Sequence, residues 1–485
     1  MALVSPVTML LDALRDTSVV LLEAYSGRPV TAGAIRNRAA QISRAPRRLV
    51  FLMADGTADS AHWFLALLEA RHPVALIDSG IAWPMIADLI DRYRPDLLVD
   101  PAGKHSRELA SSPQGARGRL TERTVWLASD GGPEPHTDLA VLLTTSGSTG
   151  SPKFVRLSSN NIRVNAEQIV DSLGITADDR GVTALPLFYS FGMSVLTSHA
   201  LAGSPVLVTA ASVVEESFWS DLVRYEVSVL PGVPATYSML KRLGFDRRDL
   251  PRLRALIQAG GRLDPELVTF FHRVMTRRGG RFFVMYGQTE ASPRISCLPS
   301  ERLPEKLGSV GLPLPGGKLA IRGKDGGEVG AGTTGEVVYR GPNVMMGYAE
   351  SRDDLALGDT CAAVLATGDL GYLDDEGFLY LTGRSNRICK LAGGRVSLDD
   401  IEIMSAWILR GEAQVAAVDG GDLGVSLFTT ALEPAAIDLR HALARELRVP
   451  PKLIVVCAVD RIPQLPNGKT DYAALERLVR AGEAK

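Results

Sequence analysis

The chain has 485 residues, of which 46% are hydrophobic and 22% charged, as in an ordinary globular protein with more than one domain. Its formal net charge of −2 gives no reason to expect a nucleic acid or an anionic membrane as partner. No run approaches about 18 consecutive apolar residues, and the N-terminus lacks the positive region of a signal peptide. The four cysteines and seven histidines show no transition-metal spacing, and scattered thiols suit a reducing cytoplasm.

Apolar runs typical of strands alternate with helical patterns through the first half of the chain. Strands are expected at residues 49–53, 73–77 and 97–99, with helices near 60–71 and 84–94. This β-α-β rhythm favours parallel sheets covered by helices.

The same rhythm continues further along. A helix capped by Ser159 or Asn160 is expected to run to about residue 173. Four more strands are expected at residues 205–208, 227–230, 253–257 and 282–285.

From about residue 308 the pattern changes to short, glycine-rich strands, which predict a small β-barrel or antiparallel layer. Residues 330–335 fit the spacing GxGxxG, but they precede a strand instead of following one, so we expect a hairpin turn and no dinucleotide site. A further change of composition near residues 383–386 leaves about 100 residues, enough for a small α/β domain.

The first candidate for chemistry is the segment 139–153. An apolar strand ends in hydroxyl residues, turns through glycines and a proline, and closes on Lys153. Hydroxyls, free amides and one cation are what a polyphosphate needs around it. The segment is not a Walker A loop, because no second glycine directly precedes the lysine and residues 154–157 have the pattern of a strand. A phosphate-holding hairpin is therefore predicted, with an ordinary surface turn as the alternative.

A second cluster, residues 286–290, directly follows an apolar strand, where parallel sheets bind ligands. Tyr286 could stack on a base, Thr289 could bond a phosphate, and Glu290 could hold Mg²⁺ through oxygen. A strand followed by a plain turn is the alternative.

Two more clusters follow. Asp369 lies in a glycine-flanked turn that suits both hydroxyls of a ribose, and Arg384 comes shortly after it. Near the C-terminus, the loop 463–470 carries Lys469. Taken singly, these could be a capping aspartate and a solvated lysine.

In order and spacing, the motifs TSGSTG-x-PK, YG-x-TE, TGD, GR and NGK closely resemble those of the adenylate-forming superfamily, which includes acyl-CoA synthetases, nonribosomal adenylation domains and luciferases. The resemblance covers nearly the whole chain from about residue 49. It implies an α/β fold with a large N-terminal domain, residues 1–384, of helix-covered and largely parallel sheets plus a small β-barrel-like layer. A hinge at 385–386 and a small mobile C-terminal α/β lid domain, 387–485, would follow.

The resemblance also implies a role for each motif. The β- and γ-phosphates of ATP would lie in the loop formed by Thr145, Ser146, Gly147, Ser148, Thr149, Gly150 and Lys153. The adenine would lie along Gly260 and Gly261 and stack on Tyr286, next to Gly287.

For the catalytic groups, the resemblance implies that Thr289 contacts the α-phosphate and that Glu290 binds Mg²⁺. Asp369, helped by Arg384, would bind the ribose. Lys469 would bridge the acid and the α-phosphate, and rotation about Asn386 would later remove it.

The expected acid pocket includes Tyr189, Gly192 and Pro234. Tyr189 stands where many family members place histidine. Amino-acid-activating relatives carry an aspartate where Gly192 aligns, and without it a buried ammonium would lack its partner. We therefore expect an aryl or a short to medium acyl acid without an α-amino group.

The expected function is ATP-dependent activation of such an acid to an acyl-adenylate with release of pyrophosphate. The acyl group would then pass to the thiol of CoA or of a carrier-protein phosphopantetheine, in the cytoplasm. One alternative is an adenylating enzyme with a non-thiol acceptor such as an amine, or one that activates an oxyanion such as nitrite. The other is a catalytically inactive, nucleotide-binding relative.

Overall fold

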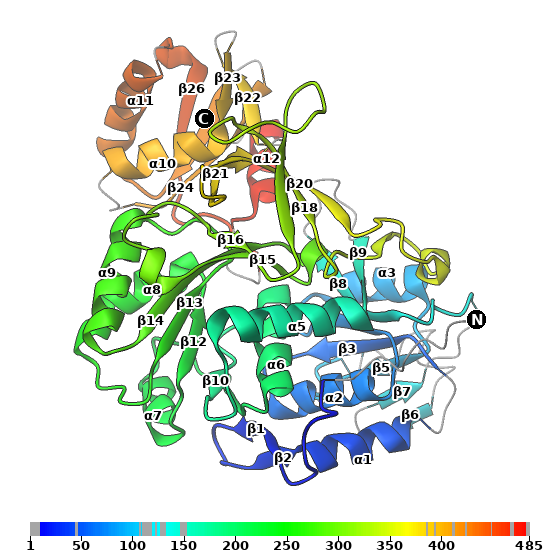
Figure 1. The fold of residues 1–485 in the computed structure, drawn as a ribbon. Helices are drawn as coiled ribbons and strands as arrows, with labels where there is room; N and C mark the ends of the chain where they lie inside the picture. The colour runs from blue at the N-terminus through cyan, green and yellow to red at the C-terminus, as the bar shows by residue number, and fades with distance from the viewer. Residues whose placement is uncertain are drawn as a thin grey trace. The chain divides into compact units, whose positions relative to one another are not determined.

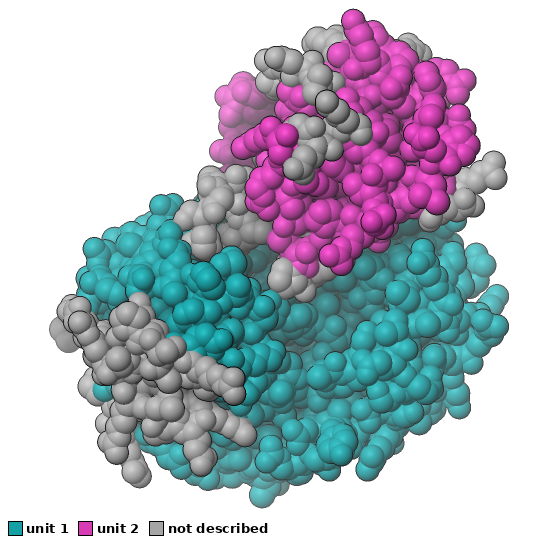
Figure 2. Space-filling view, turned by 180° about the vertical axis from the view of Figure 1, so that it is seen from behind, with its two compact units in different colours: residues 1–147, 151–319, 339–365 teal, residues 148–150, 320–338, 366–485 magenta. Residues whose placement is uncertain are grey.

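The computed structural model describes residues 10–43, 47–105, 108, 119–121, 124–126, 132–145, 153–384, 387–391, 394–409, 413–421, 424–447, 449–465 and 470–481. Figure 1 shows the elements of this α/β protein. The chain divides into two compact units, coloured separately in Figure 2. The first comprises residues 1–147, 151–319 and 339–365, and the second comprises residues 148–150, 320–338 and 366–485.

The largest sheet of the first unit has eight strands, and its four central strands run parallel. Its order is β19 (Gly347–Ala349), β9 (Lys153–Ser158), β8 (Leu139–Thr145), β4 (Val74–Asp78), β3 (Val50–Ala54), β5 (Leu97–Val99), β7 (Thr124–Trp126) and β6 (Arg119–Thr121). The predicted hairpin is present, because β8 pairs antiparallel with β9 and Thr145 lies opposite Lys153. The turn that joins these two strands lies outside the described residues.

Two smaller sheets complete this unit. One has the order β10 (Gly181–Val182), β11 (Val206–Val208), β1 (Val19–Glu23) and β2 (Pro29–Thr31). The other has the order β12 (Val229–Gly232), β13 (Ala255–Gln258), β14 (Arg281–Gly287), β15 (Arg294–Leu298) and β16 (Leu312–Pro313). Strands β12 to β14 are parallel, and β15 turns back antiparallel to β14.

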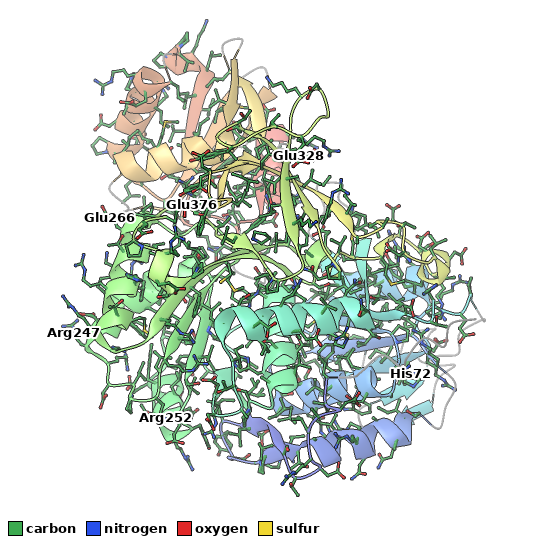
Figure 3. All side chains as sticks on the ribbon, viewed as in Figure 1. His72, Arg247, Arg252, Glu266, Glu328 and Glu376 are labelled. Carbon is green, nitrogen blue, oxygen red and sulfur yellow. The ribbon has the colours of Figure 1, made fainter. Side chains whose placement is uncertain are left out.

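The long helices of this unit are α1 (Ala32–Ile42), α2 (Ala58–Glu69), α3 (Trp83–Tyr93), α5 (Ser159–Leu173), α6 (Ser190–Ala202), α7 (Glu216–Arg224), α8 (Pro234–Arg242) and α9 (Pro265–Arg277). Short 3-10 helices are η2 (Phe245–Arg247), η3 (Thr289–Ala291), η4 (Ser300–Arg302) and η5 (Asp353–Ala356). Charged side chains such as Arg247 and Glu266 extend from the surface of the unit (Figure 3).

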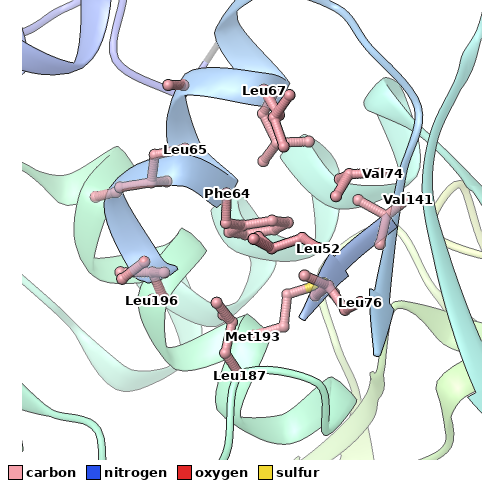
Figure 4. Close-up of a cluster of buried hydrophobic side chains, with 14 of the residues drawn as sticks. Leu52, Phe64, Leu65, Leu67, Val74, Leu76, Val141, Leu187, Met193 and Leu196 are labelled. Atoms are coloured by element: carbon pink, nitrogen blue, oxygen red, sulfur yellow. The ribbon is translucent and has the colours of Figure 1, made fainter. Parts of the chain in front are cut away.

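Helices α5 and α6 lie between the two larger sheets (Figure 1). Met193 and Leu196 of α6 pack with the core of the eight-stranded sheet (Figure 4), whereas Phe191 and Val195 pack with the core of the five-stranded sheet. Residues 190–200 are all buried, as expected of a helix covered on both sides.

The expected cap of α5 was wrong by one position. Ser158 caps the helix: its hydroxyl accepts from the amide of Asn161, whose side chain accepts from the Ser158 amide. This reciprocal capping box satisfies two amides at once, which a cap at Ser159 or Asn160 would leave open.

The second unit contains the sheet β17 (Lys318–Arg322), β18 (Gly335–Arg340), β20 (Val364–Leu373) and β21 (Leu379–Arg384), although a few end residues of these strands belong to the first unit. It also contains the hairpin β22 (Ile388–Leu391) and β23 (Gly394–Ser397), and the sheet β24 (Val415–Asp419), β25 (Val425–Thr429) and β26 (Ile454–Ala458). Its helices are α10 (Leu398–Ile408), α11 (Ala435–Glu446), α12 (Tyr472–Arg480) and the 3-10 helix η7 (Pro451–Leu453).

The second unit is larger than the predicted lid of residues 387–485, because α10 packs against β21. Residues 385 and 386 lie outside the described residues, so the hinge and the predicted domain boundary stay predictions. The GxGxxG segment is a turn that leads into β18, as expected.

Candidate active site

The turn that follows β14 carries two of the predicted catalytic residues. Thr289 and Glu290 lie in η3, directly beyond the end of the parallel strand. The hydroxyl of Thr289 lies 3.1 Å from that of Ser190 at the start of α6. One oxygen of Glu290, Oε1, accepts a hydrogen bond of 2.9 Å from the hydroxyl of Tyr348. A hydroxyl and a carboxylate are thus held at the end of the strand, where α/β sheets bind ligands.

Tyr348 joins this turn to the predicted phosphate loop. It lies in β19 beside β9, the strand that begins with Lys153. The ammonium of Lys153 lies 3.6 Å from the centre of the Tyr348 ring, and the hydroxyl of the same ring binds Glu290. Burial and the negative charge of Glu290 raise the pKa of Tyr348, so its hydroxyl stays protonated and donates. One aromatic side chain therefore positions both a cation and a carboxylate.

Asn343 fixes the same turn through hydrogen bonds from its side chain. Its side chain is fully buried, and its amide donates to the carbonyls of Ala291 at 2.6 Å and Arg294 at 2.9 Å. Its oxygen accepts from the hydroxyl of Tyr339 at 2.7 Å. Neither Asn343 nor Tyr348 was predicted from the sequence. The signal near them was the pair of glycines at 341 and 347, but their partners in the turn lie 49 to 58 residues away.

Gly260 and Gly261 lie beyond the end of β13, close to two of the predicted pocket residues. Gly260 has φ of +84°, and a Cβ there would stand 2.6 Å from the Tyr189 hydroxyl. A Cβ on Gly261 would stand 3.2 Å from the ring of Pro234. Buried Gln258 donates to the carbonyl of Gly261 at 2.8 Å and so fixes the turn. The structure thus brings four predicted residues together, and only glycine fits at position 260.

Gly192 has a different role from the one that its place in the motif suggested. A Cβ at this position would lie 2.1 Å from the carbonyl oxygen of Pro186 and 2.8 Å from that of Leu185. The missing side chain would therefore point into the backbone. No side chain, an aspartate included, fits at position 192 in this backbone.

In the second unit, Asp369 and Arg384 lie opposite each other on neighbouring strands β20 and β21. The Nε of Arg384 donates to Oδ1 of Asp369 at 2.8 Å, and the Asp369 amide donates to the hydroxyl of Thr367. The Asp369 side chain is 5% exposed and that of Arg384 is 53% exposed. The two residues predicted to hold the ribose are therefore a hydrogen-bonded pair.

The remaining predicted residues divide into two groups. Tyr286 and Gly287 end β14, and Tyr286 is 8% exposed. The side chain of Thr145, together with Ser146, Gly147, Ser148, Thr149, Gly150, Asn386 and Lys469, lies outside the described residues.

The described residues suit a magnesium–nucleotide complex better than a resident metal. They contain no group of three or more His, Cys, Asp or Glu side chains that could hold an ion. Mg²⁺ is usually bound by one or two carboxylates together with substrate phosphates and water. Tyr348 occupies only Oε1 of Glu290, and Oε2 has no hydrogen-bond partner within the described part of the chain.

The chain belongs to the AMP-binding enzyme family, which residues 32–349 match. It is 32% identical over 365 residues to an indoleacetate–CoA ligase of Aromatoleum aromaticum, a match that spans 71% of this chain and 68% of that protein. It is 33% identical over 286 residues to a 2-succinylbenzoate–CoA ligase of Bacillus subtilis, spanning 58% of this chain but only 56% of that protein. The prediction of an adenylate-forming enzyme is confirmed.

Solved structures agree on the fold. An o-succinylbenzoate CoA synthetase from Bacillus subtilis, in complex with its acyl-adenylate intermediate, matches with a TM-score of 0.73 at 24% identity, covering 95% of this chain and 96% of that one. ATP-bound MatB from Rhodopseudomonas palustris matches with a TM-score of 0.76 at 21% identity, covering 97% and 98%. The predicted α/β fold class is confirmed. Among the described helices, none is long and apolar enough to cross a membrane.

Proposed function

We propose that this protein is an AMP-forming acid–CoA ligase, which activates a carboxylic acid with ATP and transfers the acyl group to CoA. The observation that carries the proposal is the link from Lys153 through Tyr348 to Glu290. It connects a cation to the carboxylate that directly follows Thr289 in the chain, at the end of a parallel strand. These are the groups that a magnesium-bound triphosphate requires.

The proposed nucleotide contacts come from several separate parts of the chain. The β- and γ-phosphates would be bound by Thr145, Ser146, Gly147, Ser148, Thr149, Gly150 and Lys153. The adenine would lie along Gly260 and Gly261 and stack on Tyr286 next to Gly287. Asp369 would accept from the ribose hydroxyls, and Arg384 would hold this carboxylate in place through its hydrogen bond.

The chemical barrier arises because a carboxylate must approach the α-phosphorus, which is also negatively charged. In this proposal Lys469 bridges the two groups, and Thr289 donates its hydroxyl to the α-phosphate. Mg²⁺, held by Glu290, would neutralise charge on the phosphates. Prearranged donors of this kind are usually the largest contribution to catalysis, and losing one typically costs on the order of 100- to 1000-fold in rate.

For the second step, we place the hinge at Asn386. Rotation there would withdraw Lys469 and bring the segment 390–396 towards the adenylate for attack by a thiol. Closure by such a lid also keeps water from a hydrolysable anhydride. A carrier-protein phosphopantetheine is the alternative acceptor, and the cytoplasm is the proposed compartment, in keeping with four cysteines that are all free thiols.

The proposed acid is an aryl or a short to medium acyl acid without an α-amino group. Two relatives of this chain act on indoleacetate and 2-succinylbenzoate, both of which contain an aromatic ring. In the alignment with amino-acid-activating relatives, Gly192 stands in place of the aspartate that would pair with an ammonium.

Pyrophosphate exchange tests the proposal directly. An active enzyme returns labelled pyrophosphate into ATP when the right acid is present, whereas an inactive nucleotide-binding protein does not. A panel of acids should be crossed with CoA, amines and nitrite. Exchange with an acid, followed by thioester formation with CoA, is the expected result. If no acid supports exchange, or if product forms only with an amine or with nitrite, the proposal is wrong.

A further inference from the structure

Arg294 is a charged side chain buried at the start of β15. It is 1% exposed, and its backbone is fixed to α5 by a hydrogen bond from the Asn165 side chain to its carbonyl. Charged side chains normally lie at the surface, as Arg247 and Arg252 do in the same unit (Figure 3). Burying an ion is costly unless it is paired with an opposite charge.

The guanidinium of Arg294 has only weak, uncharged partners. Its Nη1 lies 2.6 Å from the sulfur of Met285, and its Nη2 donates to the hydroxyl of Ser194 at 3.2 Å. Its central carbon lies 4.2 Å from the centre of the Phe191 ring. The buried Nε has no partner at all within the described residues. A thioether is a poor acceptor, and neither a hydroxyl nor a ring supplies a negative charge.

The ionisable neighbours of Arg294 do not neutralise it either. Burial raises the pKa of the Cys297 thiol to about 12 and that of the Tyr189 hydroxyl to about 12, so both are neutral at pH 7. Burial lowers the pKa of Arg294 to about 10, so the guanidinium still carries its proton at neutral pH. No described carboxylate forms an ion pair with Arg294. Among the described residues, no negative charge neutralises this buried cation.

Arg156 shows what a structural buried arginine looks like in this protein. It is also fully buried, but its donors are taken up by the carbonyls of Tyr348, Leu357, Gly358 and Met346. Arg156 therefore joins three segments and has no free donor for a ligand. Arg294 differs because, within the part of the chain that the structure describes, its side chain donates to no carbonyl and its Nε has no partner.

Arg294 also lies next to the proposed reaction centre. Ser194, which it contacts, is one helical turn beyond Ser190 on the same face of α6, or about 6 Å along the helix. The hydroxyl of Ser190 lies 3.1 Å from that of Thr289. Phe191 and Met285, which flank the guanidinium, are apolar. An acid whose reactive carboxylate lies at Thr289, and whose far end follows α6 from Ser190 to Ser194, would reach Arg294.

We infer that Arg294 binds a second anionic group on the substrate, so that the acid is a dicarboxylic acid with a spacer of a few carbons or one aromatic ring. This inference rests on the proposed function. A carboxylate can accept two parallel hydrogen bonds from a guanidinium, which supplies the missing counter-ion and replaces the weak contact with sulfur. An acid with an apolar far end would leave the charge unpaired, and sites built for a polar group reject such analogues strongly.

The test compares pairs of acids that differ only at the far end. Suitable pairs are glutarate with its monomethyl ester, and 4-carboxyphenylacetate with 4-methylphenylacetate. Pyrophosphate exchange with any acid supports the proposed function, and the preference within a pair tests the inference separately. We expect kcat/KM for the better dicarboxylic acid to exceed that of its partner by about 100-fold or more.

Two substitutions assign this preference to Arg294. Arg294→Met should lower kcat/KM for the dicarboxylic acid by about 100-fold and leave that of the apolar partner unchanged or higher. Arg294→Lys retains the charge without the paired donors, so its kcat/KM for the dicarboxylic acid should lie between those of the wild type and of Arg294→Met. If the wild type prefers the apolar acids, or if Arg294→Met keeps the wild-type preference, the inference is wrong.

Two further experiments cover the cases in which Arg294→Met does not fold or no acid supports exchange. Ser194→Ala removes only the hydroxyl contact, so it serves if Arg294→Met does not fold, and it should weaken the preference for the dicarboxylic acid. If no acid supports exchange, the thermal shift with glutarate and 4-carboxyphenylacetate decides. A shift in the wild type that is lost in Arg294→Met upholds the inference while the proposed function fails. If the apolar partner acids shift the melting temperature of the wild type as much as the dicarboxylic acids do, the inference is wrong.

Discussion

Tyr348→Phe is the most informative substitution, because it removes one oxygen atom from the centre of the proposed phosphate site. The phenylalanine ring would still lie under the ammonium of Lys153, so only the bond to Glu290 is lost. A hydrogen bond to a charged group is worth about 1.5–3 kcal/mol when buried. Tyr348 is 37% exposed, so solvent screening reduces this to about 1 kcal/mol.

A loss of about 1 kcal/mol corresponds to about a fivefold decrease in kcat/KM for ATP. Tyr348→Ala also removes the cation–π contact, worth about 0.5–1 kcal/mol at an exposed site. The decrease should then reach about 30-fold at most. Because Glu290 loses an anchor in both variants, more Mg²⁺ should be needed to reach half-maximal rate.

The assay is pyrophosphate exchange at saturating acid, with ATP and Mg²⁺ varied independently. Tyr25→Phe is the matched control, because it makes the same chemical change at a side chain that is 98% exposed. If Tyr348→Phe and Tyr348→Ala both remain within about twofold of the wild type at every Mg²⁺ concentration, then Tyr348 does not position Lys153 and Glu290 for catalysis.

Three further predictions concern other parts of the protein. Asn343→Ala should lower the free energy of unfolding by about 2 kcal/mol in chemical denaturation, because it leaves the buried carbonyl of Ala291 without a donor, and an unchanged midpoint would contradict this. For Asp179, burial raises the pKa, but hydrogen bonds from Arg254, the amide of Thr176 and the hydroxyl of Ser228 outweigh it and lower the pKa to about 2. Its stabilisation, about 2 kcal/mol, is therefore complete above about pH 4 and lost as the pH falls towards 2, a dependence that should disappear in Asp179→Asn. Lys469→Ala should abolish adenylation but still transfer the acyl group from a synthetic acyl-adenylate to CoA, and equal loss of both half-reactions would refute the two-conformation scheme.

Several features of the site could be predicted because they depend on short stretches of chain. The pairing of β8 with β9 follows from an apolar strand, a glycine-rich turn and a second strand within 20 residues. Asp369 is an exception: it was expected in a turn, but it lies within β20 and pairs with Arg384, 15 residues further on, in the hairpin of β20 and β21. The position of Thr289 and Glu290 beyond a parallel strand follows from one apolar run and the polar residues after it.

Local pattern was less reliable where neighbouring residues compete for one role. Ser158, Ser159 and Asn160 can all cap a helix, and the capping box with Asn161 selects the first. Gly192 looked like a substitution within the acid pocket. In the folded chain it is the point where α6 passes too close to the carbonyl of Pro186 for any side chain.

The sequence alone determined the family, the α/β class and the motifs that would hold ATP, because each depends on residues that are neighbours along the chain. Tertiary structure decided what surrounds those motifs. Tyr348 meets Glu290 from 58 residues away, and Arg294 contacts Ser194 across 100 residues. Such contacts arise when strands and helices distant in sequence pack against each other, so no local sequence pattern predicts them. The burial of Arg294 without a carboxylate partner among the described residues, from which we infer a dicarboxylic acid, arises only in the folded chain.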